Sequence, residues 1–381
     1  MNILLLIILC FLGLQLLIIL LESFNYFKKY NIQFKDYLQK FCIYDKKLKK
    51  VDFLLHAVSC GEALSLQPII NYLERKKYSY LITVHTPTGY HLLSKKNKNV
   101  ILKPFDTFFT IAYLFYCIQP KIICIAESDT WPHYIALAKY LNIKIYFFNY
   151  TKKNKPFRNL VHKFIATQIF TKEKIGNLKI LSTYIPMILH KKFDTIIIAS
   201  ASQDEFKIHL EYMKYCINLK KDVKIIYVPR HLNWKEEFDR MMDLEYYLFY
   251  DCRENDINIL LERYNILVVW SIGNLNQMYK YSKICLMGDT FNKVGGHNII
   301  EPGVNNNFIL LGPNYETCKD LIPYVKQLYI VDNIQELKEK TLDIIQSNII
   351  CNNKEFIIKK KDTILSNFTL CMDSIDEDYK N

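Results

Sequence analysis

Short apolar runs recur along most of the chain, and polar stretches compatible with helices separate them. This alternation is typical of βαβ units, in which helices cover a buried parallel sheet. There are too many runs for one small sheet, so we expect an α/β fold with two sheets, divided near residues 180–192. The expected strands are Val51–Val58, Tyr78–Val84, Lys121–Ala126, Ile143–Phe148, Thr195–Ala199, Val223–Val228, Tyr264–Val269, Lys283–Met287 and Phe308–Leu311.

The amino-terminal segment Ile3–Leu21 is apolar except for one glycine and one glutamine. A membrane-spanning helix needs about 20 apolar residues, so this segment is long enough. No basic residue precedes it and no Ala-x-Ala site ends it, which argues against a cleaved signal peptide. Lys28, Lys29 and further lysines follow, so the positive-inside rule places the remainder in the cytoplasm. We expect a single-span inner-membrane anchor over residues 1–22; the alternative is a buried core helix.

Length and composition fit two globular domains. The 381 residues are half hydrophobic, enough for two separate cores, which we place at residues 23–185 and 186–381. The eleven cysteines are scattered and form no CxxC pair, which indicates reduced thiols in the cytoplasm. Cys124 and Cys285 lie within apolar runs, where we expect them to be small core residues.

The net charge of +12, from 50 basic and 38 acidic side chains, favours an acidic partner. No RNA-binding motif or basic-aromatic repeat is present, so we expect no nucleic-acid partner. Together with the apolar segment, the charge points to an anionic membrane surface and a phosphorylated lipid substrate.

Ligands of doubly wound sheets bind beyond the carboxyl ends of the strands, so the residues after each apolar run are the candidate site residues. Glu62 follows the first run and would lie in the first turn of a helix, where it can act as general base for a hydroxyl acceptor. The alternative is a glutamate that only complements the helix dipole.

Two further polar turns follow strands of the first half. Thr86, Thr88 and Gly89 form a turn that can hold a phosphate or sugar, although the same residues are common in plain turns. Glu127 and Asp129 place two carboxylates after one strand, and Asp129 can also be read as a helix N-cap.

Four polar turns in the second half each follow an expected strand and offer donors for a phosphate or sugar. Arg230 is a fixed fork of donors suited to phosphate, and a glycine turn before a helix presents backbone amides. The turns contain Ser200 and Ser202; Pro229 and Arg230; Ile272, Gly273 and Asn274; and Gly295, Gly296, His297, Asn298 and Glu301.

Several other enzyme classes lack their signatures in this chain. GxGxxG and GxxxxGK[ST] are absent, which argues against dinucleotide dehydrogenases and P-loop ATPases. There is no GxSxG motif of a serine hydrolase. The nine histidines show no HExxH or other paired ligand spacing, so we expect no metal site and no cofactor.

The motifs occur in the order seen in transferases of 3-deoxy-D-manno-octulosonic acid (Kdo), and the chain resembles that family over roughly residues 50–320. The motifs are HAVSCGE, TPTGY, ESDTWP, GNLK, VPRH, IGNL and GGHNIIEP. The resemblance implies a GT-B fold of two Rossmann-like domains, the first for a lipid A precursor and the second for CMP-Kdo.

The resemblance also implies roles for individual residues. Glu62 matches the catalytic base, and Glu127, at a second acidic position on the acceptor side, is predicted to be catalytic with it. Thr86, Thr88 and Gly89 would bind the acceptor. The CMP-sugar would be bound by Ser200, Ser202, Pro229, Arg230, Ile272, Gly273, Asn274, Asn298 and Glu301. A single displacement would invert the anomeric carbon without a metal. The other hypotheses are a GT-B transferase using a UDP-sugar and a non-catalytic membrane-associated scaffold or lipid-binding protein.

Overall fold

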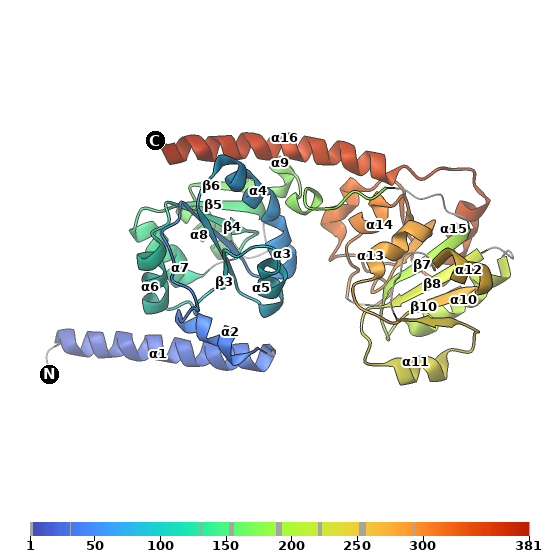
Figure 1. Cartoon of the computed structure of the whole chain (residues 1–381), viewed down its shortest axis with the longest axis horizontal. Coiled ribbons are helices and arrows are strands. Elements are labelled where there is room, and N and C mark those ends of the chain that lie inside the picture. Colours follow the sequence, from blue (N-terminus) through green and yellow to red (C-terminus); the bar gives the residue numbers. More distant parts are fainter. Residues whose placement is uncertain are drawn as a thin grey trace. The chain divides into compact units, whose positions relative to one another are not determined.

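The computed structural model describes residues 3–30, 32–129, 131–151, 156–187, 193–219, 223–250, 257–292 and 294–380. The chain forms two compact units, one of Met1–Ser182 with Thr363–Asn381 and the other of Thr183–Asp362 (Figure 1). Each unit contains one parallel sheet covered by helices, so the predicted α/β fold with two Rossmann-like domains is confirmed.

The first unit has a six-stranded sheet in the order β3-β2-β1-β4-β5-β6. The central strands are buried on both faces because they consist of apolar and β-branched residues, and Leu55 of β1 pairs with Ile82 and Cys124 on either side. The strands are β1 (Phe53–Ala57), β2 (Tyr80–Val84), β3 (Val100–Leu102), β4 (Ile122–Ala126), β5 (Lys144–Tyr150) and β6 (Gln168–Thr171).

Short helices connect the strands of this unit and return the chain to the same edge of the sheet. They are α3 (Cys60–Ser65), α4 (Gln67–Lys76), α5 (Pro87–Ser94), α6 (Phe108–Ile118), α7 (Pro132–Tyr140) and α8 (Pro156–Ile165). Helix α2 (Phe34–Leu38) precedes β1, and α9 (Lys172–Ile175) follows β6.

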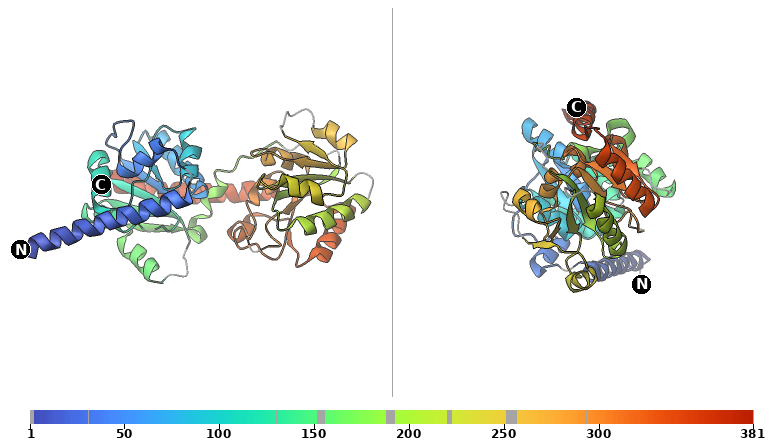
Figure 2. Two further views of the ribbon diagram at one scale, coloured as in Figure 1. Left: turned by 90° about the horizontal axis from the view of Figure 1, so that it is seen from below. Right: turned by 90° about the vertical axis from the view of Figure 1, so that its right-hand side faces the viewer.

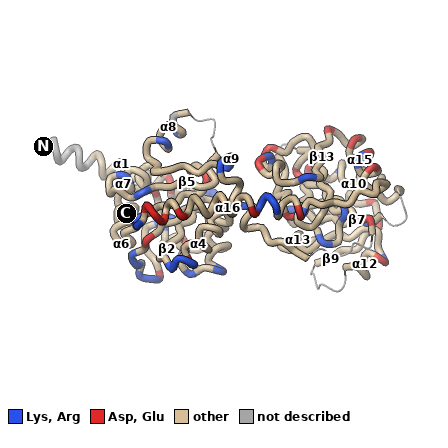
Figure 3. Tube along the Cα trace, turned by 90° about the horizontal axis from the view of Figure 1, so that it is seen from above, with Lys and Arg blue, Asp and Glu red and all other residues tan. Residues whose placement is uncertain are grey.

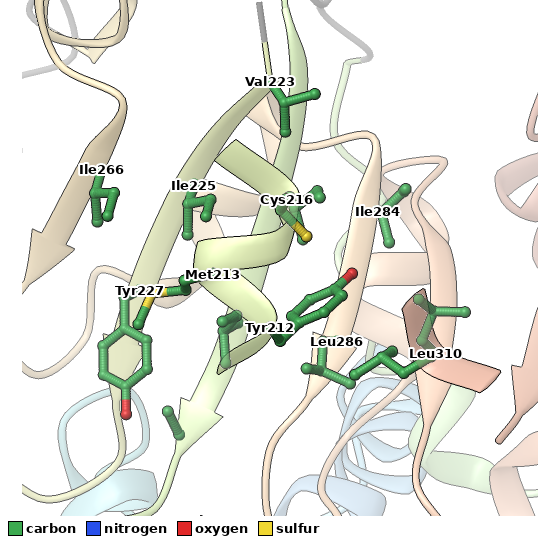
Figure 4. Close-up of a cluster of buried hydrophobic side chains, with 14 of the residues drawn as sticks. Tyr212, Met213, Cys216, Val223, Ile225, Tyr227, Ile266, Ile284, Leu286 and Leu310 are labelled. Carbon is green, nitrogen blue, oxygen red and sulfur yellow. The ribbon is translucent and has the colours of Figure 1, made fainter. Parts of the chain in front are cut away.

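The second unit has a seven-stranded sheet in the order β13-β12-β11-β7-β8-β10-β9. Figure 4 shows its core, where Tyr212, Met213 and Cys216 of α10 lie over apolar side chains of β8 and β11. The strands are β7 (Asp194–Ala201), β8 (Val223–Pro229), β9 (Tyr247–Phe249), β10 (Ile266–Val269), β11 (Ile284–Met287), β12 (Phe308–Leu311) and β13 (Leu328–Ile330). The helices are α10 (Phe206–Leu219), α11 (Lys235–Met241), α12 (Ile257–Arg263), α13 (Leu275–Met278), α14 (Ile300–Val304) and α15 (Ile334–Gln346).

The carboxy-terminal helix α16 (Asn353–Lys380) begins in the second unit, and its residues from 363 onward pack on the first (Figure 1). The hydroxyl of Tyr72 donates to Asp373 at 2.7 Å, and the ring of Tyr379 stacks on Phe53. The sequence predicted that all of residues 186–381 belong to the second domain, which is wrong for 363–381, because these contacts tie that part of the helix to the first sheet.

Helix α1 (Ile3–Lys29) contacts the first unit through the few polar residues in its sequence. The Gln15 side-chain oxygen accepts from the backbone N–H of Phe108 at 2.7 Å, and the Glu22 carboxylate from that of Asp106 at 3.0 Å. Most apolar side chains between residues 10 and 29 are exposed, and Figure 2 shows the helix running along the first unit. Within the described part of the chain, α1 is the one helix whose length and composition allow it to cross a membrane.

Candidate active site

Glu62 lies in the first turn of α3, directly after β1, as its position in the sequence predicts. Its two carboxylate oxygens are bound locally: Oε2 accepts from the backbone N–H of Val58 at 2.7 Å, and Oε1 from the Ser59 hydroxyl at 3.2 Å. Ser59 in turn caps the helix by accepting from the N–H of Glu62. Glu62 therefore lies where its carboxylate complements the dipole of α3, as the alternative interpretation of this residue predicts. The same hydrogen bonds also fix the orientation of its carboxylate.

The surroundings of Glu62 favour its protonated form. Burial is the main cause, followed by the charge of Asp129, and Glu127 adds to the effect, so that the pKa of Glu62 is raised to about 7. The hydrogen bonds from Val58 and Ser59 act in the opposite direction and only partly offset these effects. A carboxyl that titrates near neutral pH can exchange a proton with a substrate hydroxyl, which an ordinary surface glutamate does poorly.

Glu127 follows β4 in a left-handed backbone conformation with φ of 59°, stabilised by the hydrogen bond from its N–H to the carbonyl of Phe148. Its carboxylate forms an ion pair with Lys179, with 3.0 Å between Nζ and Oε1. Lys179 also lies next to α3, since a methyl group added to Gly61 would lie 3.6 Å from its Nζ. The structure thus brings Glu62, Glu127 and Lys179 together; Lys179 belongs to the GNLK motif but was not among the predicted site residues.

Asp129 is not the N-cap of the following helix. The N-cap position of α7 is occupied by Trp131, with a proline after it, and its side chain makes no capping hydrogen bond. Asp106 performs this role from a distant loop, with its two oxygens accepting from the N–H groups of His133 and Tyr134 at 3.0 and 3.1 Å. The predicted capping role of Asp129 is therefore wrong, and its charge instead acts on Glu62.

The turn after β2 is a helix start. Thr86 is the N-cap of α5 and accepts from the N–H of Gly89 at 3.2 Å, while the Thr88 hydroxyl donates to that of Thr86. A methyl group at position 89 would lie 2.8 Å from Val84 and 3.3 Å from the backbone of Ser59, so glycine permits the close approach of α5 to the loop that precedes Glu62. These contacts account for the residues structurally, and a ligand-binding role for Thr86, Thr88 and Gly89 stays a prediction.

In the second unit, Arg230 follows β8 and binds a buried carboxylate. Its Nη1 donates to Oδ2 of Asp289 at 2.8 Å, and the same oxygen lies 2.7 Å from Nε2 of His297. Burial alone would raise the pKa of Asp289, but hydrogen bonds from Asn292, His297 and Arg230 outweigh it and lower the pKa to about 2. Asp289 thus holds Arg230 in place while leaving the guanidinium partly exposed to a ligand.

Asp289 was not among the predicted site residues, although it follows β11 as the other site residues follow their strands. It lies in a loop that Glu205 organises, since the Glu205 carboxylate accepts from the N–H groups of Asp289, Phe291 and Asn292 at 2.5–2.9 Å. Its left-handed φ of 61° is maintained by these bonds. The rule that directs attention to strand ends would have found Asp289, but Gly288-Asp289-Thr290 has no distinctive composition.

Ser200 and Ser202 follow β7. Ser202 accepts from the side-chain amide of Asn292 at 3.1 Å, which joins it to the cluster around Asp289. Ser200 has a positive φ of 54°, and its carbonyl would lie 2.4 Å from a methyl group on Gly288. β7 and β11 therefore approach one another at their carboxyl ends more closely than any other residue at 288 would allow.

The glycine pair of GGHNIIEP is used by the protein itself. The N–H groups of Gly295 and Gly296 donate to the carbonyl of Asp289 at 2.8 and 2.9 Å, with φ of 101° and 84°. Asn298 and Glu301 form a separate pair, joined at 2.9 Å, and burial raises the pKa of Glu301. The glycines thus shape the turn that carries His297, Asn298 and Glu301.

Pro229 ends β8, and the turn Ile272–Asn274 follows β10. Gly273 has a φ of 96° and Ile272 is largely exposed, while the amide of Asn274 donates to the Ser271 hydroxyl at 2.7 Å. Because β11, β7, β8 and β10 are consecutive neighbours in the sheet, all the predicted donor-binding residues lie at one edge of it. The described contacts join Ser202 and Arg230 through Asn292 and Asp289, and leave the Ile272–Asn274 turn and the Asn298–Glu301 pair as separate clusters.

Comparison with known proteins supports the resemblance seen in the sequence. Residues 35–179 match the model of the 3-deoxy-D-manno-octulosonic-acid transferase family. The Kdo transferase of Aquifex aeolicus is 26% identical over 313 residues, which are 76% of this chain and 85% of that protein. The Kdo transferase of Chlamydia trachomatis serovar A is 22% identical over 81% of each chain.

Solved structures share the arrangement of elements within the chain. A glycosyltransferase of Rickettsia africae covers 87% of this chain with a TM-score of 0.54 and 15% identity, and this chain covers 98% of it. At that identity the likeness concerns the fold alone, and it confirms the predicted GT-B class.

Proposed function

We propose that this chain, a glycosyltransferase related to the Kdo transferases, transfers Kdo from CMP-Kdo to the lipid A precursor lipid IVA. The observation that carries the proposal is Glu62, a largely buried carboxyl with its pKa raised to about 7, placed after β1 within the segment that matches the family. A hydroxyl acceptor requires such a base, and the relatives act on the sugar that we propose as donor.

In the proposed reaction, Glu62 accepts the proton of the acceptor's primary hydroxyl as the oxygen attacks the anomeric carbon of Kdo. The bond from that carbon to the phosphate oxygen of CMP breaks, and the electron pair leaves with CMP. A single displacement inverts the anomeric carbon. The ion pair of Glu127 and Lys179 lies beside Glu62. Its charges influence the pKa of Glu62 and therefore the pH at which Glu62 can act as a base.

The leaving CMP carries the developing negative charge, and Arg230 is positioned to stabilise it. Its guanidinium is held by Asp289 and remains partly exposed, so it is already oriented when the nucleotide binds. Preorganised donors of this kind supply the stabilisation that a metal supplies in other transferases, which supports a reaction independent of metal and cofactor. Ser200, Ser202, Pro229, the Ile272–Asn274 turn, Asn298 and Glu301 complete the proposed donor site.

The acceptor is a lipid, so the enzyme has to work at a membrane. We propose that α1 attaches the chain to the inner membrane with both units on the cytoplasmic side, and that an excess of basic side chains favours the anionic surface. Lys and Arg, blue in Figure 3, occur over much of the first unit, whereas Asp and Glu mark the part of α16 that packs on it.

The test is a transfer assay with purified full-length protein, CMP-Kdo and tetraacyl lipid IVA, in which mass spectrometry identifies the lipid product. We expect a Kdo-lipid from the parent protein, at least 100-fold less from Glu62→Gln, and an unchanged yield from Glu173→Gln, which alters an exposed glutamate of α9. No product from the folded parent would refute the proposal. Stabilisation of the protein by UDP rather than by CMP would favour a UDP-sugar transferase, and full activity of Glu62→Gln would refute the role of the base.

A further inference from the structure

We infer that α1 lies in the plane of the membrane surface, with its polar side on the first unit and its apolar side in the lipid, rather than crossing the bilayer. This inference rests on the membrane attachment proposed above. It differs from the single span that the sequence predicts, and it follows from the contacts of α1 and the surface beside it.

The polar residues of α1 point to the protein. Gln15, Glu22 and Tyr26 are seven and four positions apart, which places them on one face of a helix. Gln15 and Glu22 accept from the first backbone N–H groups around the start of α6, and the Tyr26 hydroxyl donates to the carbonyl of His85 at 2.9 Å. The ammonium of Lys40 lies 4.1 Å from the ring centre of Tyr26. These contacts fix α1 along the first unit between Gln15 and Tyr26.

Glu22 also brings a negative charge towards two buried cations. Lys40 and Lys103 are fully buried, and burial is the main cause that lowers the pKa of each ammonium. Glu22 opposes this effect at both lysines, and Asp106 lies 3.7 Å from Lys103. If α1 left the unit, the two lysines would lose the compensating charge of Glu22. The polar side chains of Gln15, Glu22 and Tyr26 would then face the lipid without their partners. The docked position is therefore favoured.

The docked residues cannot at the same time lie across a bilayer. Contacts of Gln15, Glu22 and Tyr26 hold this part of α1 along the surface of the first unit, so it is not free to cross the hydrocarbon core of about 30 Å. A helix with an apolar outer face and a polar inner face that is already paired instead suits the boundary between lipid and water.

The outer face of α1 continues onto α6. The ring of Phe11 contacts those of Phe108 and Phe109, with centroids 5.8 and 6.1 Å apart. Phe109, Tyr113 and Tyr116 are exposed along α6, and aromatic side chains of this kind concentrate at membrane interfaces.

Basic residues border this apolar surface. Lys28 and Lys29 end α1, and a surface pocket beside Tyr113 and Tyr116 is lined by Lys46, Lys47 and Lys50. Exposed leucines and phenylalanines flanked by lysines complement anionic lipid, so the occupant that we assign to this surface is the bilayer.

The experiment uses the full chain with an amino-terminal epitope tag behind a protease site, expressed in bacterial cells. If α1 lies in the plane, external protease added to spheroplasts leaves the tag intact, and the tag is cut in inverted membrane vesicles; a carboxy-terminal tag behaves identically. Cleavage of the amino-terminal tag in spheroplasts would show a spanning helix and overturn the inference. Protein that stays in the supernatant when the membranes are sedimented would overturn the membrane attachment itself. The two outcomes therefore distinguish a failure of this inference from a failure of the proposed attachment.

Variants supply a second measurement. The double variant Gln15→Leu/Glu22→Leu removes the polar contacts and leaves an apolar segment long enough to span, so its tag is expected to become cleavable in spheroplasts. Leu16→Val/Leu20→Val, on the exposed face, is the matched control and keeps the tag protected. In addition, Tyr116→Trp in reconstituted vesicles is expected to gain fluorescence that brominated lipids quench, and an unquenched signal would show that α6 does not meet the lipid.

Discussion

The proton of Glu62 depends on opposing effects within a few ångströms. The helix start and two hydrogen bonds favour the carboxylate, whereas burial and the charges of Asp129 and Glu127 favour the acid. The second group of effects is larger, and the pKa is raised to about 7. The motif around Glu62 could be recognised in the sequence. The balance of these effects could not be predicted, because it depends on Glu127 and Asp129, which follow β4.

The first prediction concerns pH. Because the base form is required, kcat/KM should rise tenfold per pH unit below about pH 7 and level off above it, and Glu62→Gln should abolish the dependence. Initial rates measured from pH 5 to 9 with saturating CMP-Kdo and with lipid IVA well below its KM test this. A rate that is flat through pH 7 in the parent protein would contradict the role of Glu62.

The same shift affects stability. The pKa of Glu62 is higher in the folded protein than its ordinary value of 4.5, so the folded state holds the proton more tightly. The parent protein therefore loses stability as the pH rises from about 4.5 through 7, and Glu62→Gln, which does not titrate, should gain relative to it by on the order of 2 kcal/mol. Urea unfolding of both proteins at pH 5 and pH 8 measures the difference.

A second prediction concerns Lys179. In Lys179→Met, Glu127 loses the cation 3.0 Å away, so its charge acts on Glu62 with less compensation. We expect the midpoint of the pH–rate profile to move upward and the rate at pH 7 to fall about tenfold, with Lys179→Arg retaining most of the activity. Lys172→Met in α9 serves as a control with the same charge change. An unchanged midpoint in Lys179→Met would contradict this account.

A third prediction concerns Asp289, which holds Arg230 and His297. Asp289→Asn keeps the size but removes the charge, so Arg230 loses its orientation before the nucleotide binds. We expect KM for CMP-Kdo to rise about tenfold and the thermal shift produced by CMP to shrink, with a smaller change in kcat. The exposed Asp332→Asn is the control. Equal CMP affinity in both variants would exclude a positioning role for Asp289.

At the scale of elements, all nine apolar runs are strands, and the strands that the sequence did not predict share one position. β3 and β6 form the edges of the first sheet, and β9 and β13 those of the second. Each has three or four residues, and three of them are only partly buried. An edge strand has one paired neighbour and one open side, so it needs no continuous apolar run and gives no periodic signal.

Helix α16 shows a different limit of prediction. Its apolar positions indicate that it packs on something, but the sequence does not say on which unit. Phe368 is buried against Phe148, and a methyl group added to Gly176 would lie 2.4 Å from Ile364, so the partner surface is built from residues about 200 positions earlier. Long-range complementarity of this kind cannot be derived from local patterns.

The fourth prediction tests this packing. Phe368→Ala removes a buried ring from the first unit and should lower the free energy of unfolding by about 3–5 kcal/mol. Leu370→Ala, two positions away and mostly exposed, should change it by less than about 0.5 kcal/mol. Chemical denaturation monitored by circular dichroism compares the two. Similar stability of both variants would contradict the assignment of residues 363–381 to the first unit.

At the scale of the whole molecule, the sequence allowed the fold class, the two sheets and a division close to Ser182 to be predicted. The order of motifs also placed the proposed donor residues at the carboxyl ends of neighbouring strands. What could not be predicted is which polar groups bind one another. Asp106 and Glu205 organise loops through bonds to backbone amides far away in the chain, and Asp289 binds the side chain of Arg230. Only the folded structure brings these partners together.

The first unit is discontinuous in the chain, because its last helix is encoded after the entire second unit. During synthesis, the amino-terminal sheet therefore leaves the ribosome with the groove for Phe368 uncovered, and about 180 further residues must be translated before that groove is filled. Domains usually fold in the order in which they emerge, whereas here the second unit can be complete before the first unit has its last helix. The apolar surface that Phe368 covers therefore stays open to solvent until the end of the chain has been made.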